Sequence, residues 1–133
     1  MYKNRHIEQQ LLLLAQHFNV IMITGARQVG KTTLLKEVFP TVPIITFDPL
    51  EDIQGARQNP NLFLKQTNTP VILDEIQYAP ELLPPLTRLI DANPDKKYFL
   101  TGSHNLSMLQ SVAESMAGRV VILHLDTMTV YEQ

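Results

Sequence analysis

Residues 24–33 have the residue types and the spacing that phosphate binding requires. They contain the pattern G-x-x-x-x-G-K-[ST] of a phosphate-binding loop. Its two glycines allow backbone angles that are closed to residues with a Cβ, so successive N–H groups can turn toward phosphate oxygens. Lys31 adds a positive charge for the β- and γ-phosphates, and the Thr32 hydroxyl is placed to hold Mg²⁺. The residues predicted to bind nucleotide are Gly25, Ala26, Arg27, Gln28, Val29, Gly30, Lys31, Thr32 and Thr33.

The segments on either side of this loop favour the same interpretation. Residues 20–23 form a short run rich in β-branched residues, which is typical of a strand buried on both faces. Apolar residues recur at helical spacing from Leu34 to Phe39, and Pro40 ends that segment. The alternative is a glycine-rich turn before a helix. A phosphate loop must follow a buried strand and begin a helix, and both flanks meet that condition.

Two carboxylates, Asp74 and Glu75, follow the apolar run at residues 70–73. In open parallel sheets, ligands gather at the carboxyl ends of the strands, where this pair is expected to lie. Asp74 is suited to hold Mg²⁺ through its water shell, as a Walker B aspartate does. Glu75 is suited to accept a proton from, or orient, the water that attacks the γ-phosphate. An acidic loop after a strand is the alternative for both residues.

Another predicted strand, residues 98–101, leads to a cluster of polar residues. A hydroxyl at the tip of a strand beside the Asp-Glu strand can sense the γ-phosphate or hold the attacking water. Ser103 is the chosen candidate, Thr101 and Asn105 stay open, and His104 is less favoured. Serine and asparagine before a helix are also ordinary helix caps, and this reading stays open too.

Arg119 comes directly before the last predicted strand, residues 120–123. A positive charge beside the leaving phosphate greatly accelerates phosphoryl transfer. A cation near the C-terminus of a helix, where it interacts with the helix dipole, explains the same residue equally well. Spacing alone leaves the two readings open.

Helices and strands alternate along the chain, which predicts an α/β fold with parallel strands joined by right-handed crossovers. An amphipathic stripe predicts a first helix over residues 7–18. The basic residues before it form either a solvated end or a segment that lies against the nucleotide base. Asp48, Pro49 and Glu51 predict the start of another helix, with Asp48 in a capping rather than a catalytic role.

Composition limits the possible classes of protein. The 133 residues carry a net charge of −2 and no cysteine. This length suits one domain, and the charge gives no support for nucleic-acid binding. The missing cysteines exclude disulfides and thiolate metal sites. The longest apolar run, residues 11–15, is far too short for a membrane span, so we expect a cytoplasmic protein without a membrane partner.

Taken together, the loop at residues 25–33, the Asp74-Glu75 pair and the segments 100–103 and 117–119 resemble one family. It is the group of predicted P-loop ATPases of the AAA superfamily that is found widely in prokaryotes, often fused to a C-terminal domain of unknown function. The resemblance implies a three-layer P-loop NTPase fold with a central parallel five-stranded sheet in the order 5-1-4-3-2. It also implies ATP and Mg²⁺ as ligands.

The same resemblance implies roles for individual residues. Lys31, Thr32 and Asp74 take the nucleotide and metal roles, Glu75 is the catalytic carboxylate, Ser103 is the sensor, and Arg119 is an arginine finger that acts on a neighbouring subunit. Residues 1–133 are then an ATP-binding core truncated before the helical lid of such proteins. We therefore expect weak nucleotide binding and slow turnover.

These roles predict an ATPase whose Mg²⁺-dependent hydrolysis of ATP is coupled to a conformational or assembly change. The alternative is a nucleotide-gated interaction module that binds ATP and scarcely hydrolyses it. A small-molecule kinase is less favoured, because neither an arginine-bearing lid nor an acceptor pocket is apparent. The sequence identifies no protein client, and it makes ATP only the better choice over GTP.

Overall fold

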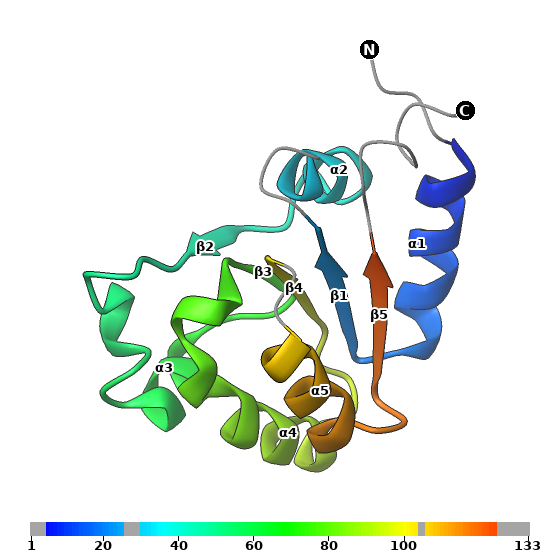
Figure 1. The fold of residues 1–133 in the computed structure, drawn as a ribbon. Helices are drawn as coiled ribbons and strands as arrows, with labels where there is room; N and C mark the ends of the chain where they lie inside the picture. Colours follow the sequence, from blue (N-terminus) through cyan, green and yellow to red (C-terminus); the bar gives the residue numbers. More distant parts are fainter. Residues whose placement is uncertain (1–4, 26–29, 104–105, 125–133) are drawn as a thin grey trace.

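A parallel five-stranded sheet lies between two layers of helices in the computed structural model, which describes residues 5–25, 30–103 and 106–124 (Figure 1). The strands are β1 (Val20–Thr24), β2 (Ile44–Thr46), β3 (Val71–Asp74), β4 (Tyr98–Gly102) and β5 (Val120–His124). The helices are α1 (Arg5–His17), α2 (Lys31–Val38), α3 (Pro60–Gln66), α4 (Leu83–Ala92) and α5 (Leu106–Ser115). Short 3-10 turns are η2 (Ile53–Gly55), η3 (Ile76–Tyr78) and η4 (Pro80–Leu82).

The strand order across the sheet is β2-β3-β4-β1-β5. This is the predicted order 5-1-4-3-2 read in the opposite direction, so the predicted fold is confirmed. The register pairs Thr24 of β1 with Gly102 on one side and with His124 on the other, and it pairs Thr46 with Asp74. The carboxyl ends of all the strands therefore meet at one edge of the sheet, where the phosphate loop begins.

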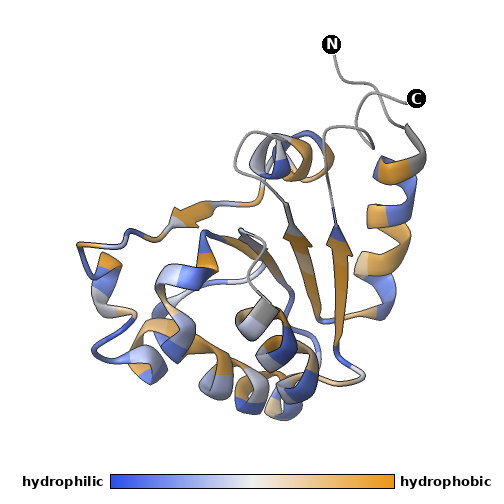
Figure 2. Ribbon diagram, viewed as in Figure 1, coloured by the Kyte–Doolittle hydropathy of each residue, from blue (hydrophilic) through white to orange (hydrophobic). Residues whose placement is uncertain are grey.

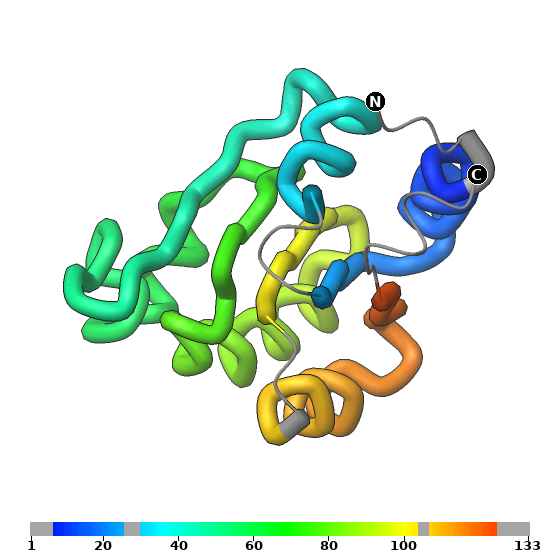
Figure 3. Tube along the Cα trace, turned by 45° about the horizontal axis from the view of Figure 1, so that its top comes forward, coloured from blue at the N-terminus to red at the C-terminus, as the bar shows by residue number. Residues whose placement is uncertain are grey.

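Both faces of the central strands are covered by helices. Successive strand residues point to opposite faces. Val20 and Met22 pack in the core that α3, α4 and α5 close, whereas Ile21 and Ile23 pack in the core that α1 and α2 close. Burial on both sides explains why β1 reads as a continuous apolar run. Figure 2 shows this apolar character in the strands, and Figure 3 shows α1 and α2 on the opposite side of the sheet from α4 and α5.

The segment after β2 differs from the sequence prediction of a helix. It forms a bend that leads to the short turn η2. Asp48 does accept hydrogen bonds from the N–H groups of Leu50 and Glu51, at 2.8 Å each. The N–H groups of Glu51 and then Leu50 lower the pKa of Asp48. An Asx turn shares this pattern with a helix start, and Leu50 is 93% exposed, so it provides no apolar contact to hold a helix against the core.

The helices predicted over residues 7–18 and after the phosphate loop are present as α1 and α2. Asn59 caps α3 by accepting a hydrogen bond from the N–H of Leu62, and the backbone turns at Gly118, which has a φ of +84°, after α5. Leu11 of α1, at the centre of the predicted stripe, is fully buried against the core. In the described part of the chain, no helix combines the length and the apolar character that a membrane crossing needs.

Candidate functional site

The buried lysine of the predicted phosphate loop lies at the carboxyl end of β1. Gly30 has a φ of +84°, a left-handed conformation that strains any residue with a side chain. Lys31 follows it as the first residue of α2 and is only 3% exposed. Its Nζ donates a hydrogen bond to the carbonyl oxygen of Gly25 at 2.9 Å. The ammonium group thus reaches back to the first glycine of the pattern, across the base of the loop.

Part of the predicted loop is outside the part of the chain that the structure describes. Those residues are Ala26, Arg27, Gln28 and Val29. Their predicted contact with nucleotide stays a prediction, and so does that of Thr33, which is exposed on the first turn of α2.

The Asp74 carboxylate accepts hydrogen bonds from three hydroxyl groups, which belong to three different elements. It is the last residue of β3 and is 8% exposed. Thr32 of α2 donates to its Oδ1 at 2.9 Å, and Thr46 of β2 donates to its Oδ2 at 3.0 Å. Thr101 of β4 also donates to Oδ1. Hydrogen bonds to a carboxylate offset the cost of burying its charge.

The contact between Thr32 and Asp74 fits the metal that the sequence predicts. Hydroxyl and carboxylate oxygens are the hard donors that Mg²⁺ prefers. Proteins bind this ion through one or two carboxylates together with water and substrate phosphates. The structure brings the predicted metal-holding pair together, on the same side of the sheet as Lys31.

Glu75 follows Asp74 in a backbone conformation that is unusual for a residue with a side chain. Its φ is +61° and its ψ is +50°, in the left-handed region, which costs roughly 1–2 kcal/mol. Its N–H donates to the Thr101 hydroxyl at 3.0 Å, and its Oε1 accepts a hydrogen bond from Nε2 of Gln77 at 2.6 Å. Both contacts stabilise the left-handed turn at Glu75, where the chain leaves the direction of β3.

At the end of β4, Thr101 and Ser103 make different contacts. Thr101 is fully buried and lies between Asp74 and Glu75, donating to the first and accepting from the second. Ser103 is half-buried just beyond the strand, and its backbone N–H donates to Oε1 of Gln77 at 3.3 Å. The sensor role of Ser103 stays a prediction. His104 and Asn105 are not among the described residues.

Arg119 lies at the opposite edge of the sheet. Its carbonyl oxygen accepts a hydrogen bond from the N–H of Val20 at 3.1 Å, at the amino end of β1. The length of β1, on the order of 13 Å, separates that point from the phosphate loop. Its guanidinium group pairs with both carboxylate oxygens of Asp91, on α4. Within one chain the structure therefore does not bring Arg119 to Lys31 and Asp74.

Three residues near the site were not predicted from the sequence. Thr46 contacts Asp74, and Gln77 contacts Glu75. His124, at the end of β5, has its Nδ1 2.7 Å from the hydroxyl of Thr24, the residue before Gly25. A polar residue at the last position of an apolar strand was the available signal for Thr46 and His124, and no comparable signal exists for Gln77.

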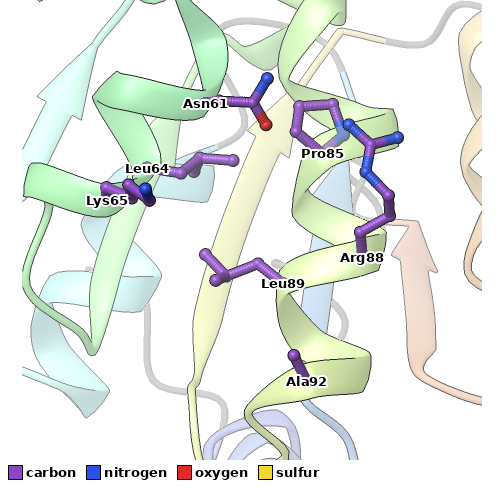
Figure 4. A pocket seen from close by; sticks show the side chains of 7 residues that line it. All are labelled: Asn61, Leu64, Lys65, Pro85, Arg88, Leu89 and Ala92. Atoms are coloured by element: carbon purple, nitrogen blue, oxygen red, sulfur yellow. The ribbon is translucent and has the colours of Figure 1, made fainter.

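A separate cavity of about 210 Å³ opens between α3 and α4 (Figure 4). Leu64 and Leu89 line it from the two helices, together with the charged residues Lys65 and Arg88. These helices cover the sheet face opposite to α2. This cavity is therefore distinct from the cluster around Lys31 and Asp74.

Residues 17–133 match a family model described as an AAA domain. Two curated relatives are the uncharacterised proteins Mb2031c of Mycobacterium bovis and Rv2008c of Mycobacterium tuberculosis. Each is 34% identical over 113 residues, which cover 84% of this chain. The chain spans about a quarter of the length of these relatives, since the match covers 26% of each.

Solved structures with the same fold include the Walker-type ATPase PABY2304 of Pyrococcus abyssi, with a TM-score of 0.58 and 19% identity over 92% of this chain and 53% of that one. The STAND protein PH0952 of Pyrococcus horikoshii, which has a tetratricopeptide repeat sensor, gives a TM-score of 0.54 and 15% identity over 94% of this chain and 23% of its own. At these identities the likeness shows the fold alone.

Proposed function

Because the chain belongs to the AAA family, as an AAA-type ATPase core, we propose that it binds ATP together with Mg²⁺ and hydrolyses it. One observation carries this proposal. The Thr32 hydroxyl touches the Asp74 carboxylate at 2.9 Å, beside a lysine that is 3% exposed and bonded across the phosphate loop. A buried lysine and a carboxylate that converge at the carboxyl edge of a parallel sheet are suited to bind a polyphosphate and its metal.

Each residue of the cluster has a role in this proposal. Lys31 exchanges its hydrogen bond with the Gly25 carbonyl for one with the β- and γ-phosphates. Thr32 and Asp74 hold Mg²⁺, which when bound neutralises the negative charge that develops on the phosphates. The remaining amides of the loop, at residues 26–29, bind phosphate oxygens.

Glu75 orients the attacking water and accepts its proton. Its Oε1 is bonded to Gln77, and its second carboxylate oxygen has no partner among the described residues. Thr101 fixes the backbone of Glu75 relative to Asp74 through a single hydroxyl. Ser103 senses the γ-phosphate from the adjacent strand end.

Phosphate release by the intact protein and by the Glu75→Gln variant tests this proposal. General-base assistance contributes about 10²- to 10⁴-fold, so we expect kcat to fall by that order while ATP still binds. Equal rates in the two proteins would contradict hydrolysis assisted by Glu75. ATP binding without phosphate release from either protein would favour the nucleotide-gated interaction module instead.

Arg119 can act on a nucleotide only from a neighbouring subunit, because it lies at the far edge of its own sheet. Its pair with Asp91 is partly exposed, with 33% and 51% of the two side chains accessible. We therefore propose that several copies of the chain assemble. We also propose that the assembly is cytoplasmic and that hydrolysis drives a conformational change that acts on a protein client. Specific activity that rises with protein concentration would support this, and a monomer with constant activity on dilution would contradict it.

A further inference from the structure

Gln77 connects two parts of the site that are far apart in sequence, Glu75 and Ser103. Its Nε2 donates to Oε1 of Glu75 at 2.6 Å, and its Oε1 accepts from the N–H of Ser103 at 3.3 Å. One side-chain amide therefore spans from the turn after β3 to Ser103, the residue that follows β4. In the described part of the chain, no other side chain donates a hydrogen bond to the Glu75 carboxylate.

Gln77 lies between a cavity and Gly102. The residue lines a cavity of about 350 Å³, together with Pro80, Leu83, Ser107 and Met108. On that side no dense packing fixes its conformation. On the other side, a Cβ added to Gly102 would lie 3.1 Å from Oε1 of Gln77, so the glycine leaves room for the amide to approach.

The charge of Glu75 fixes which way the Gln77 amide points. A carboxylate only accepts hydrogen bonds, so the NH₂ group must face Glu75. The amide oxygen then faces Ser103, where it meets a backbone N–H that can only donate. Rotation of the amide by half a turn would place oxygen against oxygen at one end and nitrogen against nitrogen at the other.

We propose that Gln77 is a positioning residue that couples the carboxylate of Glu75 to the backbone of Ser103. The inference rests on the proposed hydrolysis, in which these two residues orient the water and sense the γ-phosphate. A shift of the Ser103 backbone on phosphate binding is transmitted through the amide to Oε1 of Glu75. Glu75 is thereby oriented toward water only when Ser103 is in place.

The first test measures this coupling without nucleotide, by NMR of the protein labelled with ¹⁵N. Glu75→Gln removes the charge that orients the Gln77 amide, so we expect the backbone amide resonance of Ser103 to shift. In the Gln77→Met background, which keeps the length of the side chain and removes its amide, the same Glu75→Gln change should leave the Ser103 resonance in place. An equal shift in both backgrounds would overturn the proposal.

The second test is kinetic. A hydrogen bond to a charged group accounts for about a tenfold effect, so Gln77→Met should lower kcat about tenfold with KM and ATP affinity unchanged. Gln77→Glu, which has nearly the same shape, should lower kcat at least as much because it opposes two carboxylates. The matched control is Gln66→Met, an exposed glutamine at the end of α3, which should keep the full kcat.

The outcomes separate this inference from the proposed function. An unchanged or increased kcat in both Gln77 variants would overturn the positioning role. If Glu75→Gln itself leaves hydrolysis intact, the proposed function fails, and the NMR comparison still decides whether Gln77 couples Glu75 to Ser103. Thermal unfolding of each variant identifies a folding defect, and the Gln77→Glu variant then stands in for Gln77→Met.

Discussion

The two edges of the sheet use polar side chains in different ways. At the amino edge, Arg119 pairs with the exposed carboxylate of Asp91, but the side chains of Asn19 and Lys97 donate to backbone carbonyls. Asn19 donates to the carbonyl oxygens of Pro94 at 2.7 Å and of Lys96 at 3.0 Å, and Lys97 donates to those of Phe18, at 2.7 Å, and Ala15. At the carboxyl edge, three donors end on the single carboxylate of Asp74.

This difference separates polar contacts that close the fold from polar contacts that can bind a ligand. A backbone carbonyl at the end of a helix or in a loop needs a donor in the folded chain, and its partner simply completes the structure. A carboxylate that accepts several hydroxyls can share its oxygens with an incoming cation. Variants at the carboxyl edge should therefore change binding, whereas variants at the amino edge should change stability.

The largest expected effect is on ATP affinity in Lys31→Ala. Removal of a buried, charge-assisted contact with phosphate should weaken binding roughly a hundredfold. Lys36→Ala is the matched control, because Lys36 lies on the same helix and donates to the carbonyl oxygens of Pro40 and Val42. Isothermal titration with ATP measures both. Equal affinities in the two variants would place the phosphate site elsewhere.

The next effect compares Asp74→Asn with Asp91→Asn, one acidic residue from each edge. Loss of the Asp74 charge should weaken Mg²⁺ binding by roughly 10- to 100-fold, as for residues that act through a metal's water shell. Asp91→Asn should leave Mg²⁺ binding unchanged and cost less than about 1 kcal/mol, because its pair with Arg119 is exposed. Titration of ATP binding with Mg²⁺ tests this, and similar Mg²⁺ dependence in both variants would argue against a metal at Asp74.

At the amino edge, Asn19→Ala should lower the free energy of unfolding by about 1–2 kcal/mol, since it removes two hydrogen bonds to the loop before β4. ATP affinity should not change. Asn68, an exposed residue in the loop before β3, supplies the control Asn68→Ala, which should leave stability within about 0.5 kcal/mol. Urea unfolding measures both, and reduced ATP affinity in Asn19→Ala would remove the distinction between the edges.

The smallest effect concerns Tyr98, at the start of β4. Its hydroxyl is buried without a hydrogen-bond partner among the described residues, and burial raises its pKa to about 12. Replacement by phenylalanine should therefore stabilise the protein by about 1 kcal/mol. A stabilising effect of zero or less would mean that the hydroxyl is satisfied in solution.

The same residue predicts a dependence on pH. The folded pKa of Tyr98 lies above the unfolded value of about 10, so unfolding releases a proton at high pH. The native protein should lose stability as the pH rises from 10 to about 12, and Tyr98→Phe should lose less over the same range. Parallel unfolding curves of the two proteins would contradict the raised pKa.

The fold could be predicted well because the sequence patterns that indicate it lie within short segments of the chain. Alternation of apolar strands with amphipathic helices defined the layers, and the resemblance of four motifs defined the strand order. The helix predicted after β2 was wrong, and the cause also lies in a short segment. Asp48 makes the hydrogen bonds expected of a helix cap, but the same bonds form in a turn, and the buried apolar contacts that distinguish the two depend on the folded chain.

The site was predictable only where a motif names its residues. Lys31, Thr32 and Asp74 belong to such motifs, and the structure brings them to one edge of the sheet. Thr46 depends on the register of β2 against β3, since it pairs directly with Asp74. The contact of Gln77 with the Glu75 carboxylate depends on a left-handed turn at Glu75. Register and backbone turns of this kind are set by tertiary packing, which a single sequence does not reveal.

The three hydroxyls around Asp74 also have a mechanical consequence. They belong to three separate elements, α2, β2 and β4. A cation bound to this carboxylate would compete for the oxygens that accept all three hydrogen bonds. The arrival of a single ion would thereby act on a helix and on the strands on both sides of β3, without any covalent link between them.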